Sequence, residues 1–534
     1  MLLRHRLATA AVIVGLSLTQ APAAHAQSYD QALDAYDAGN YADAASLFYA
    51  AIQFDDEDRA IVAESQFGLA KSLFEMKLYV ASLKYFEDIV KSGSDHPHFT
   101  KAIKHLIQIA DILGDDLKIP PVIDAVYVAE FDFLSKLAVS EADMFESMHY
   151  IMGKYLFKRG ETREARKLLK TIPEDSVRYP HAQYLVGLIY MGINRADRPD
   201  PKYKKALAAF ENARSAIPEK VKDQDLLDLR DLASLAIARV YYQRGYIEED
   251  DKARTKYLTM SDYEYKLIPR FSKAWPAAIF ERSWTQTVQE RYGDALGTLH
   301  NLNAPYFEGE FYPEAEILQS IIYFYNCQWD RIEVTLEDTK ARYAPIVSHI
   351  DGLLKNEDLE FAEWYALLNK SLEGNKTELT EGLIPWKVAK AIAEDDRFKK
   401  METFLRQVEK EGQVFENDST FSTSQMGPEM VETAAANRDA FLDILGKYVK
   451  TKLTGLKVEL NDITNRARIV LLETKTAEAQ WLEEGRKIGG KPRGVLPRPS
   501  IPNDEFQFWW FRGEYWVDEL GYYGAAIKSE CFER

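Results

Sequence analysis

Apolar and small residues recur through most of the chain at intervals of three and four positions, which is the spacing of one face of an α-helix. The first such face carries Tyr29, Ala32 and Tyr36, and a second begins after Gly39. Two short amphipathic helices joined at a glycine form a helix–turn–helix unit. The pattern therefore predicts an all-α fold that begins with a pair of antiparallel helices.

The same arrangement returns further along the chain. Small residues allow two helices to cross closely, a glycine permits the turn between them, and aromatic side chains fill the groove toward the next pair. Residues 98–140 match poorly, and a polar insertion lies near residues 194–201. The later copies are carried by Phe67, Ala70, Leu73, Tyr79, Phe86 and Ile89; by Gly153, Leu156, Gly160, Ala165 and Leu169; by Gly187, Tyr190, Ala206, Phe210 and Ala213; by Ala238, Tyr241, Gly245 and Tyr246; and by the turns Tyr292-Gly293-Asp294-Ala295 and Cys327-Gln328-Trp329-Asp330.

These copies resemble the tetratricopeptide repeat (TPR), a helix–turn–helix of about 34 residues. The resemblance covers residues 27–345 in about eight units. It implies a TPR-like α-solenoid, and the concave face of such an array is an extended surface for binding other proteins.

A long helix is expected after an irregular helical region at residues 346–427, whose polar end, residues 418–427, is predicted to be a linker or surface loop. Residues 428–487 contain a heptad seam and are predicted to be one long helix, with division into two helices at Gly446 and Gly455 as the alternative. The seam either folds back on the array or on its own second half, or forms a coiled coil with a partner or a second copy. Its positions are Leu442, Leu445, Val449, Leu453, Leu456, Leu460, Ile463, Ala467 and Val470.

Composition narrows the functional class. The 534 residues carry 67 Lys and Arg against 84 Asp and Glu, a formal net charge of −17. This balance argues against nucleic acid and against attachment to anionic lipid by charge. Two cysteines exclude a disulfide-rich scaffold and a four-cysteine zinc site.

Residues 1–26 are predicted to be a cleaved signal peptide. Arg4 and Arg6 precede an apolar run at Leu7–Leu18, and Ala24-His25-Ala26 is a small-x-small cleavage site. The alternative is a membrane anchor. No cysteine lies near the cleavage site, and no later segment reaches about 18 apolar residues. We expect Sec-type export to a bacterial periplasm, with no lipid anchor and no membrane-spanning segment in the mature chain.

Residues 488–534 are predicted to be a basic Pro/Gly linker followed by an aromatic-rich tail. Such an apolar tail needs a covering surface, so it either folds back on the chain or docks into another protein, and glycan stacking is a third alternative. The candidate partner-binding residues are Trp509, Trp510, Phe511, Arg512, Tyr515, Trp516, Tyr522 and Tyr523.

Cys327 lies in a repeat turn and Cys531 near the end of the sequence. In an oxidising compartment, a disulfide between them would tie the tail to the array. The alternative is two unpaired thiols, one of them buried.

The tail and one repeat carry a second resemblance. The segment Gly513–Tyr523 with Cys531, and the series Pro313-Glu314-Ala315, Tyr323-Phe324 and Cys327, are similar to large periplasmic TPR proteins of myxobacteria and their relatives. Some of those belong to the envelope part of the adventurous gliding machinery. The resemblance implies a scaffold in a trans-envelope assembly.

No catalytic motif stands out in the sequence. His96-Pro97-His98 beside Asp95 is a weak metal candidate, and the run Asp55–Asp58 lacks the spacing of a calcium loop. We expect no enzymatic activity, no cofactor and no metal. An enzyme assembled from scattered residues is a minor alternative.

The predicted function is therefore a scaffold that binds envelope proteins for gliding motility, secretion or outer-membrane assembly. The alternative is a cell-wall factor that binds peptidoglycan or glycan through the aromatic tail. A homo-oligomer through the long helix is a further prediction.

Overall fold

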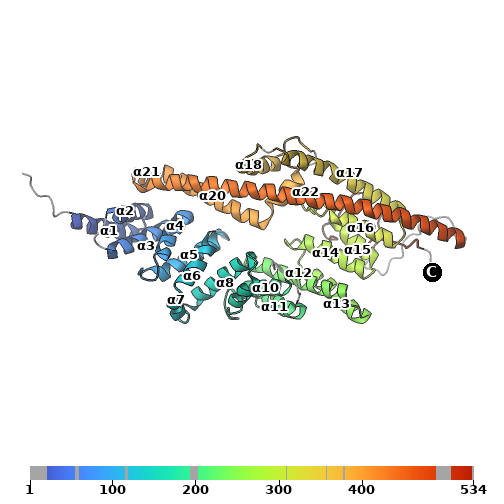
Figure 1. Cartoon of the computed structure of the whole chain (residues 1–534), viewed down its shortest axis with the longest axis horizontal. Helices are drawn as coiled ribbons and strands as arrows, with labels where there is room; N and C mark the ends of the chain where they lie inside the picture. The colour runs from blue at the N-terminus through green and yellow to red at the C-terminus, as the bar shows by residue number, and fades with distance from the viewer. Residues whose placement is uncertain are drawn as a thin grey trace, which may run out of the picture. The chain divides into compact units, whose positions relative to one another are not determined.

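The computed structural model describes residues 21–54, 59–114, 118–192, 202–307, 309–356, 358–376, 379–488 and 507–531. These residues form α-helices and one short 3-10 helix, and no β-strand occurs among them (Figure 1). The all-α prediction is confirmed. The predicted signal peptide lies outside the described residues, apart from the backbone of residues 21–26 at the start of helix α1.

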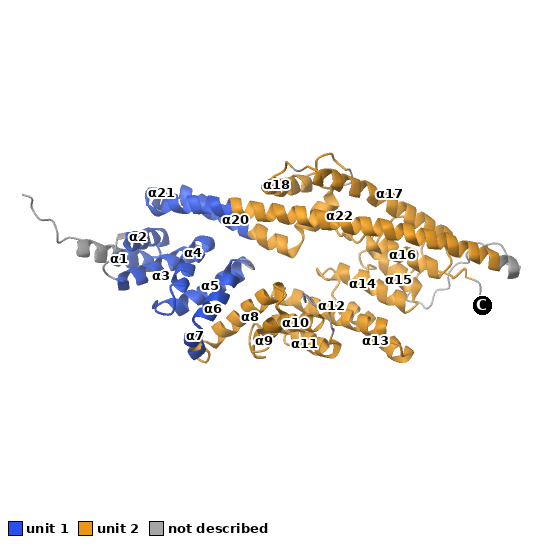
Figure 2. Ribbon diagram, viewed as in Figure 1, with its two compact units in different colours: residues 1–136, 404–438 blue, residues 137–403, 439–534 orange. Residues whose placement is uncertain are grey.

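The chain forms two compact units, each of which combines segments far apart in the sequence (Figure 2). Unit 1 contains residues 1–136 and 404–438, and unit 2 contains residues 137–403 and 439–534. The domains predicted from the sequence are consecutive stretches, because a repeat pattern relates only residues that are close together in the sequence.

Unit 1 starts with helices that pack consecutively, α1 on α2 and so on to α5. Its core joins Phe48 and Leu69 to Phe415, Phe421 and Met430 from the later segment. The polar stretch at residues 418–427, expected to be a linker or surface loop, instead contains a short helix, and Phe421 in it is fully buried. The helices of unit 1 are α1 (Ala21–Asp37), α2 (Tyr41–Phe54), α3 (Arg59–Glu75), α4 (Tyr79–Lys91), α5 (Phe99–Leu113), α6 (Ile119–Ala129), α7 (Phe131–Leu137), α21 (Ser419–Thr423) and parts of α20 (Asp396–Asn417) and α22 (Met426–Ile488).

Unit 2 continues the tandem arrangement. From α8 to α17 each helix packs on its sequence neighbour, and the alternate helices α10, α12, α14 and α16 also contact one another in order. This second set of contacts stacks one pair on the next. The remaining helices of unit 2 are α8 (Ala142–Lys158), α9 (Thr162–Leu169), α10 (Tyr179–Tyr190), α11 (Tyr203–Ser215), α12 (Gln224–Ile247), α13 (Asp251–Leu267), α14 (Trp275–Val288), α15 (Tyr292–Asn301), α16 (Glu314–Tyr325), α17 (Trp329–Leu354), α18 (Phe361–Leu372) and α19 (Trp386–Ala393), with the 3-10 helix η1 (Pro305–Phe307).

The turns within the pairs share one backbone geometry. A residue with positive φ donates its N–H to the carbonyl three residues back, and the next residue donates to the carbonyl five residues back, which satisfies the last carbonyls of the first helix. Glycine was expected at these turns, because it has no Cβ to clash at positive φ. Three of the positions carry other residues. The positions are Gly39, Lys77, Gly160, Glu290 and Cys327.

The loops between pairs also repeat. In each of three loops, one backbone N–H donates to the carbonyl three residues before it. Three residues further on, at the start of the next helix, a second N–H donates to the carbonyl three residues before it. The three loops are residues 93–99, 173–179 and 269–275. Small residues stand where helices cross: a Cβ on Gly153 or Gly245 would lie 2.7 Å from a leucine side chain of the following helix. The chain therefore repeats both its turns and its packing.

Helix α22 is a single helix of 63 residues, so Gly446 and Gly455 do not divide it. Within unit 2 its heptad seam is buried, including Leu445, Val449, Leu453 and Leu460. Other residues of unit 2 supply the ion pairs beside this seam, for example Lys452 with Asp395, which precedes α20, at 2.8 Å and Lys475 with Glu333 of α17 at 2.8 Å. The folded-back alternative is the arrangement present, and a coiled coil through this seam would first have to expose it.

Candidate functional site

The aromatic segment, residues 507–531, lies along helices α14–α16 of unit 2. Two glycines on one face of α15 allow it to approach closely. A Cβ on Gly293 would lie 2.6 Å from the carbonyl oxygen of Ala525, and a Cβ on Gly297 would overlap the carbonyl of Tyr523. The sequence analysis placed Gly293 in a repeat turn. It lies instead in the first turn of α15, and its role is close approach of the segment.

Backbone hydrogen bonds hold the segment along this path. The N–H of Gly521 donates to Oδ1 of Asn301 at 2.6 Å, and the N–H of Ala525 donates to the Gly293 carbonyl at 2.9 Å. Arg270 donates to the carbonyls of Val517 and Asp518. Since most of these bonds use the backbone of the segment, its path is fixed largely independently of its side chains.

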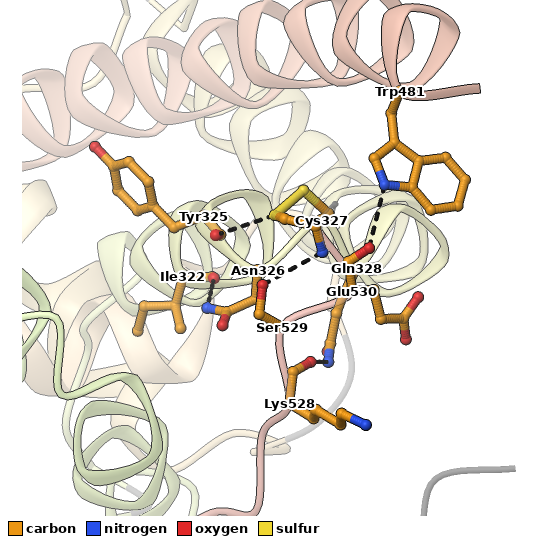
Figure 3. The surroundings of a disulfide bond; sticks show 10 residues. Ile322, Tyr325, Asn326, Cys327, Gln328, Trp481, Lys528, Ser529 and Glu530 are labelled. Atoms are coloured by element: carbon orange, nitrogen blue, oxygen red, sulfur yellow. Dashed lines mark hydrogen bonds between the residues drawn. A yellow bond between two sulfur atoms is a disulfide. The ribbon is translucent and has the colours of Figure 1, made fainter. Parts of the chain in front are cut away.

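A disulfide joins the segment to the array. Cys327, in the turn between α16 and α17, is bonded to Cys531, and their Cα atoms are 5.1 Å apart (Figure 3). Three hydrogen bonds surround the bridge: Gln328 Nε2 donates to the Lys528 carbonyl at 2.8 Å, the Glu530 N–H donates to the Asn326 carbonyl at 2.9 Å, and Trp481 Nε1 of α22 donates to the Glu530 carbonyl at 3.2 Å. The bridged state is the one present, and neither cysteine is free.

One row of aromatic residues in the segment faces inward. Tyr523 is buried and joins a core cluster that includes Trp275 and Phe307, together with Leu520, which is 1% exposed. Tyr515 stacks on the imidazole of His300, with ring centroids 4.8 Å apart.

Burial shifts the titration of both members of that stacked pair. It lowers the pKa of His300, which favours the neutral form of the imidazole. Burial, with a smaller contribution from Tyr523, raises the pKa of Tyr515 to about 12. The inward row is therefore an uncharged, structural part of unit 2.

A second row faces solvent. Trp510 is 72% exposed, Tyr522 65% and Val517 62%, and Phe511 and Trp516 are also exposed. Exposed rings of the array adjoin this row, because the Arg270 guanidinium lies over both Tyr522 and Phe271. Phe271 in turn contacts Tyr306, with ring centroids 4.7 Å apart. We call these exposed residues the aromatic face; its members are Trp510, Phe511, Trp516, Val517, Tyr522, Phe271 and Tyr306.

The eight candidate partner-binding residues therefore divide between two environments. Tyr523, Tyr515 and Trp509 lie in or against the core of unit 2. Trp510, Phe511, Arg512, Trp516 and Tyr522 are exposed. Sequence reasoning missed Leu520, His300, Asn301 and Arg270. The pair Gly293 and Gly297, one helical turn apart, was the available signal that a backbone passes over α15.

A second concave site lies on α12 and α14. Arg239 and Glu281 form an ion pair there, and the Tyr265 hydroxyl donates to Glu281 at 3.1 Å. With Tyr242 and Trp284 these residues line a hollow of about 350 Å³. Most of its charged and aromatic side chains lie on the alternate helices α12 and α14, and Tyr265 reaches it from α13.

The weak metal candidates do not form a metal centre in the described residues. His96 Nε2 lies 3.1 Å from Gln66 Oε1, and His98 lies 2.8 Å from Glu64 and stacks on Phe67. No group of three or more potential ligands gathers in the described ranges. The acidic run at residues 55–58 lies outside the described residues.

None of the helices in the described part of the chain combines the length and apolar character that a membrane span requires. Comparison of the sequence with protein-family models yields no match, and a search of curated proteins yields none.

Proposed function

We propose that this chain is a non-enzymatic scaffold with a TPR-like solenoid, exported to a bacterial envelope, which binds partner proteins there through the aromatic face. One observation carries the proposal. The segment that bears the face is fixed to the array by backbone hydrogen bonds and a disulfide, yet among the described residues its outer aromatic row stays exposed. Exposed aromatic rings on a rigid support are the usual anchors of protein interfaces.

The repeated turns, the glycines at the helix crossings and the contacts between alternate helices support the TPR-like assignment. The disulfide supports export, because such bonds persist in oxidising compartments. The myxobacterial resemblance supports a role in a trans-envelope machine, of which gliding motility, secretion and outer-membrane assembly are the candidates.

The test is a crosslinked pull-down from native envelope with point variants of the exposed row. Trp510→Ser and Trp516→Ser together remove two anchors and keep Leu520 and Tyr523 in the chain, whereas deletion of the segment would remove both and expose Trp275 and Phe307. Tyr246→Ser, at an aromatic residue 64% exposed on α12, is the matched control. We expect the double variant to lose specific envelope proteins that the control retains. Retention of the same set by both variants would contradict the role of the aromatic face.

Binding of peptidoglycan or another glycan is the second candidate. It is favoured by the exposed indoles of Trp510 and Trp516, since aromatic rings stack on sugar rings. Sedimentation with purified sacculi separates the two functions. Only the glycan function predicts that the chain sediments with sacculi and that the same double variant stays in solution.

A further inference from the structure

A cavity of about 600 Å³ lies within unit 2, and its described wall contains no residue of the aromatic segment. Its walls come from the loop after α15, from the middle of α17 and from the segment leading into α19. The volume lies in the range of about 300–1,000 Å³ that sites for small ligands and inserted side chains occupy. The cavity therefore has room for one long side chain and part of its backbone.

Aromatic rings form much of the wall. Phe307 and Tyr343 are buried, and Phe311, Tyr312 and Trp386 are partly exposed to the cavity. Such rings present negative π faces, which attract the ammonium or guanidinium group of an entering ligand. They also bury the apolar stem that carries such a group.

Most of the charged groups in and beside the cavity have partners. Arg342 forms an ion pair with Glu316. Lys376 lies over one ring, that of Trp386, at 4.9 Å, and Lys390 lies over the same ring at 5.4 Å. Lys387 is exposed at the edge. Lys390 also forms an ion pair with Glu394 at 3.2 Å, so its charge is shared between that carboxylate and the interior carboxylate described next.

Glu310 is that carboxylate. Its side chain is partly buried in the cavity wall and has no hydrogen bond or ion pair among the described residues. Burial raises its pKa, the nearby Glu394 raises it further, and Lys390 opposes the shift. Burial raises the pKa of Tyr312, and the negative charge of Glu310 raises it further. A cation placed beside Glu310 would stabilise the charged form of this carboxylate.

We propose that this cavity receives a lysine or arginine side chain of a partner protein, with its charge at Glu310 and its stem along the aromatic wall. The inference rests on the proposed scaffold function and names the chemistry of a partner. The formal net charge of −17 is complementary to a basic partner surface. The exposed Lys387 at the edge can donate to a backbone carbonyl of the entering chain.

The test is calorimetric titration of the full chain with four short capped peptides, Gly-X-Gly, in which X is lysine, arginine, norleucine or glutamate. We expect saturable binding of the lysine and arginine peptides that weakens with salt. The norleucine and glutamate peptides should bind at least about tenfold more weakly, since they lack the charge that Glu310 attracts. Equal binding of norleucine, preference for glutamate, or no binding of any peptide would overturn the proposal.

Glu310→Gln removes the charge at constant size and should weaken the lysine peptide at least about tenfold. Glu381→Gln, at an exposed carboxylate of the neighbouring loop, should leave the affinity unchanged. The peptide series on the unaltered chain decides the matter even if Glu310→Gln fails to fold. In the envelope pull-down, the tryptophan double variant can lose partner proteins that Glu310→Gln retains. That result would support the scaffold function and would contradict the proposed role of Glu310.

Discussion

Leu520 anchors the aromatic segment, and its truncation tests how the segment is held. Leu520 is 1% exposed and lies in a cluster with Trp275 and Phe307. Leu520→Ala removes this buried contact and leaves a cavity, which costs about 2–5 kcal/mol for leucine in a packed core. At about 1.4 kcal/mol per tenfold, the equilibrium for opening the segment should rise at least about 30-fold.

Hydrogen exchange followed by mass spectrometry measures this opening directly. The amides of Gly521 and Ala525 bond to Asn301 and Gly293 only when the segment is docked, so they report on it. Their exchange should accelerate at least about 30-fold in Leu520→Ala, while the amides of α8 and α9 keep their rates. The disulfide keeps the far end of the segment attached, so opening rather than loss of the segment is observed.

Val517→Ala is the matched control, because Val517 lies in the same segment and is 62% exposed. An exposed substitution of this kind changes stability by no more than about 0.5 kcal/mol, so exchange should change less than about threefold. The reasoning fails if Leu520→Ala leaves the rates of Gly521 and Ala525 unchanged, or if Val517→Ala accelerates them equally. Either result would mean that the buried leucine does not hold the segment.

Three further predictions concern other contacts of the two units. Gly297→Ala should destabilise docking of the segment, because the new Cβ overlaps the Tyr523 carbonyl. Gly455→Ala on α22, where the Cβ meets open space, should instead stabilise its helix by about 1 kcal/mol. Thermal unfolding temperatures that shift in the same direction for both variants would contradict this prediction. Reduction of the disulfide should make the segment 507–531 far more sensitive to protease, while helices α8–α15 resist cleavage. If the segment resists protease equally before and after reduction, the bridge is dispensable for docking. Glu411, buried in unit 1, accepts the N–H groups of Val80 and Ala81, and burial raises its pKa to about 7. The folded state then binds more protons than the unfolded state between about pH 4.5 and 7, so stability should fall by about 3 kcal/mol as pH rises through this range and change little above it. Urea unfolding of Glu411→Gln should lose this slope, whereas Glu416→Gln, at an exposed carboxylate of the same helix, should keep it.

The helical pairs and the long helix could be predicted from the sequence because their signals are local. Gly153 and Gly245 mark close crossings that the structure contains, and the seam at Leu445, Val449 and Leu453 is buried. Each of these patterns depends on residues three to seven positions apart, and helix geometry alone relates such residues in space.

Contacts between distant segments were not predictable in the same way. Phe421 lies in a stretch rich in serine and threonine, yet it is fully buried against the first helices of unit 1. The division of the aromatic residues into buried and exposed rows depends on the path of an irregular segment over α15. Because the segment has no helical periodicity, its sequence pattern does not predict which side chains are buried. Cys327 was placed in a turn from the sequence, but Lys77 and Glu290 at positive φ were missed, because a turn fixed by two backbone hydrogen bonds tolerates residues other than glycine.

The disulfide also determines how the aromatic segment bears mechanical load. A strand attached at one end peels away under force, because its contacts break one after another. Here the segment is continuous with the chain on one side and covalently bonded to the turn at Cys327 on the other. A partner that pulls on Trp510 or Tyr522 therefore loads both attachments together, and the contacts between them are sheared as a group. The force passes into the turn between α16 and α17, so the array itself carries the tension.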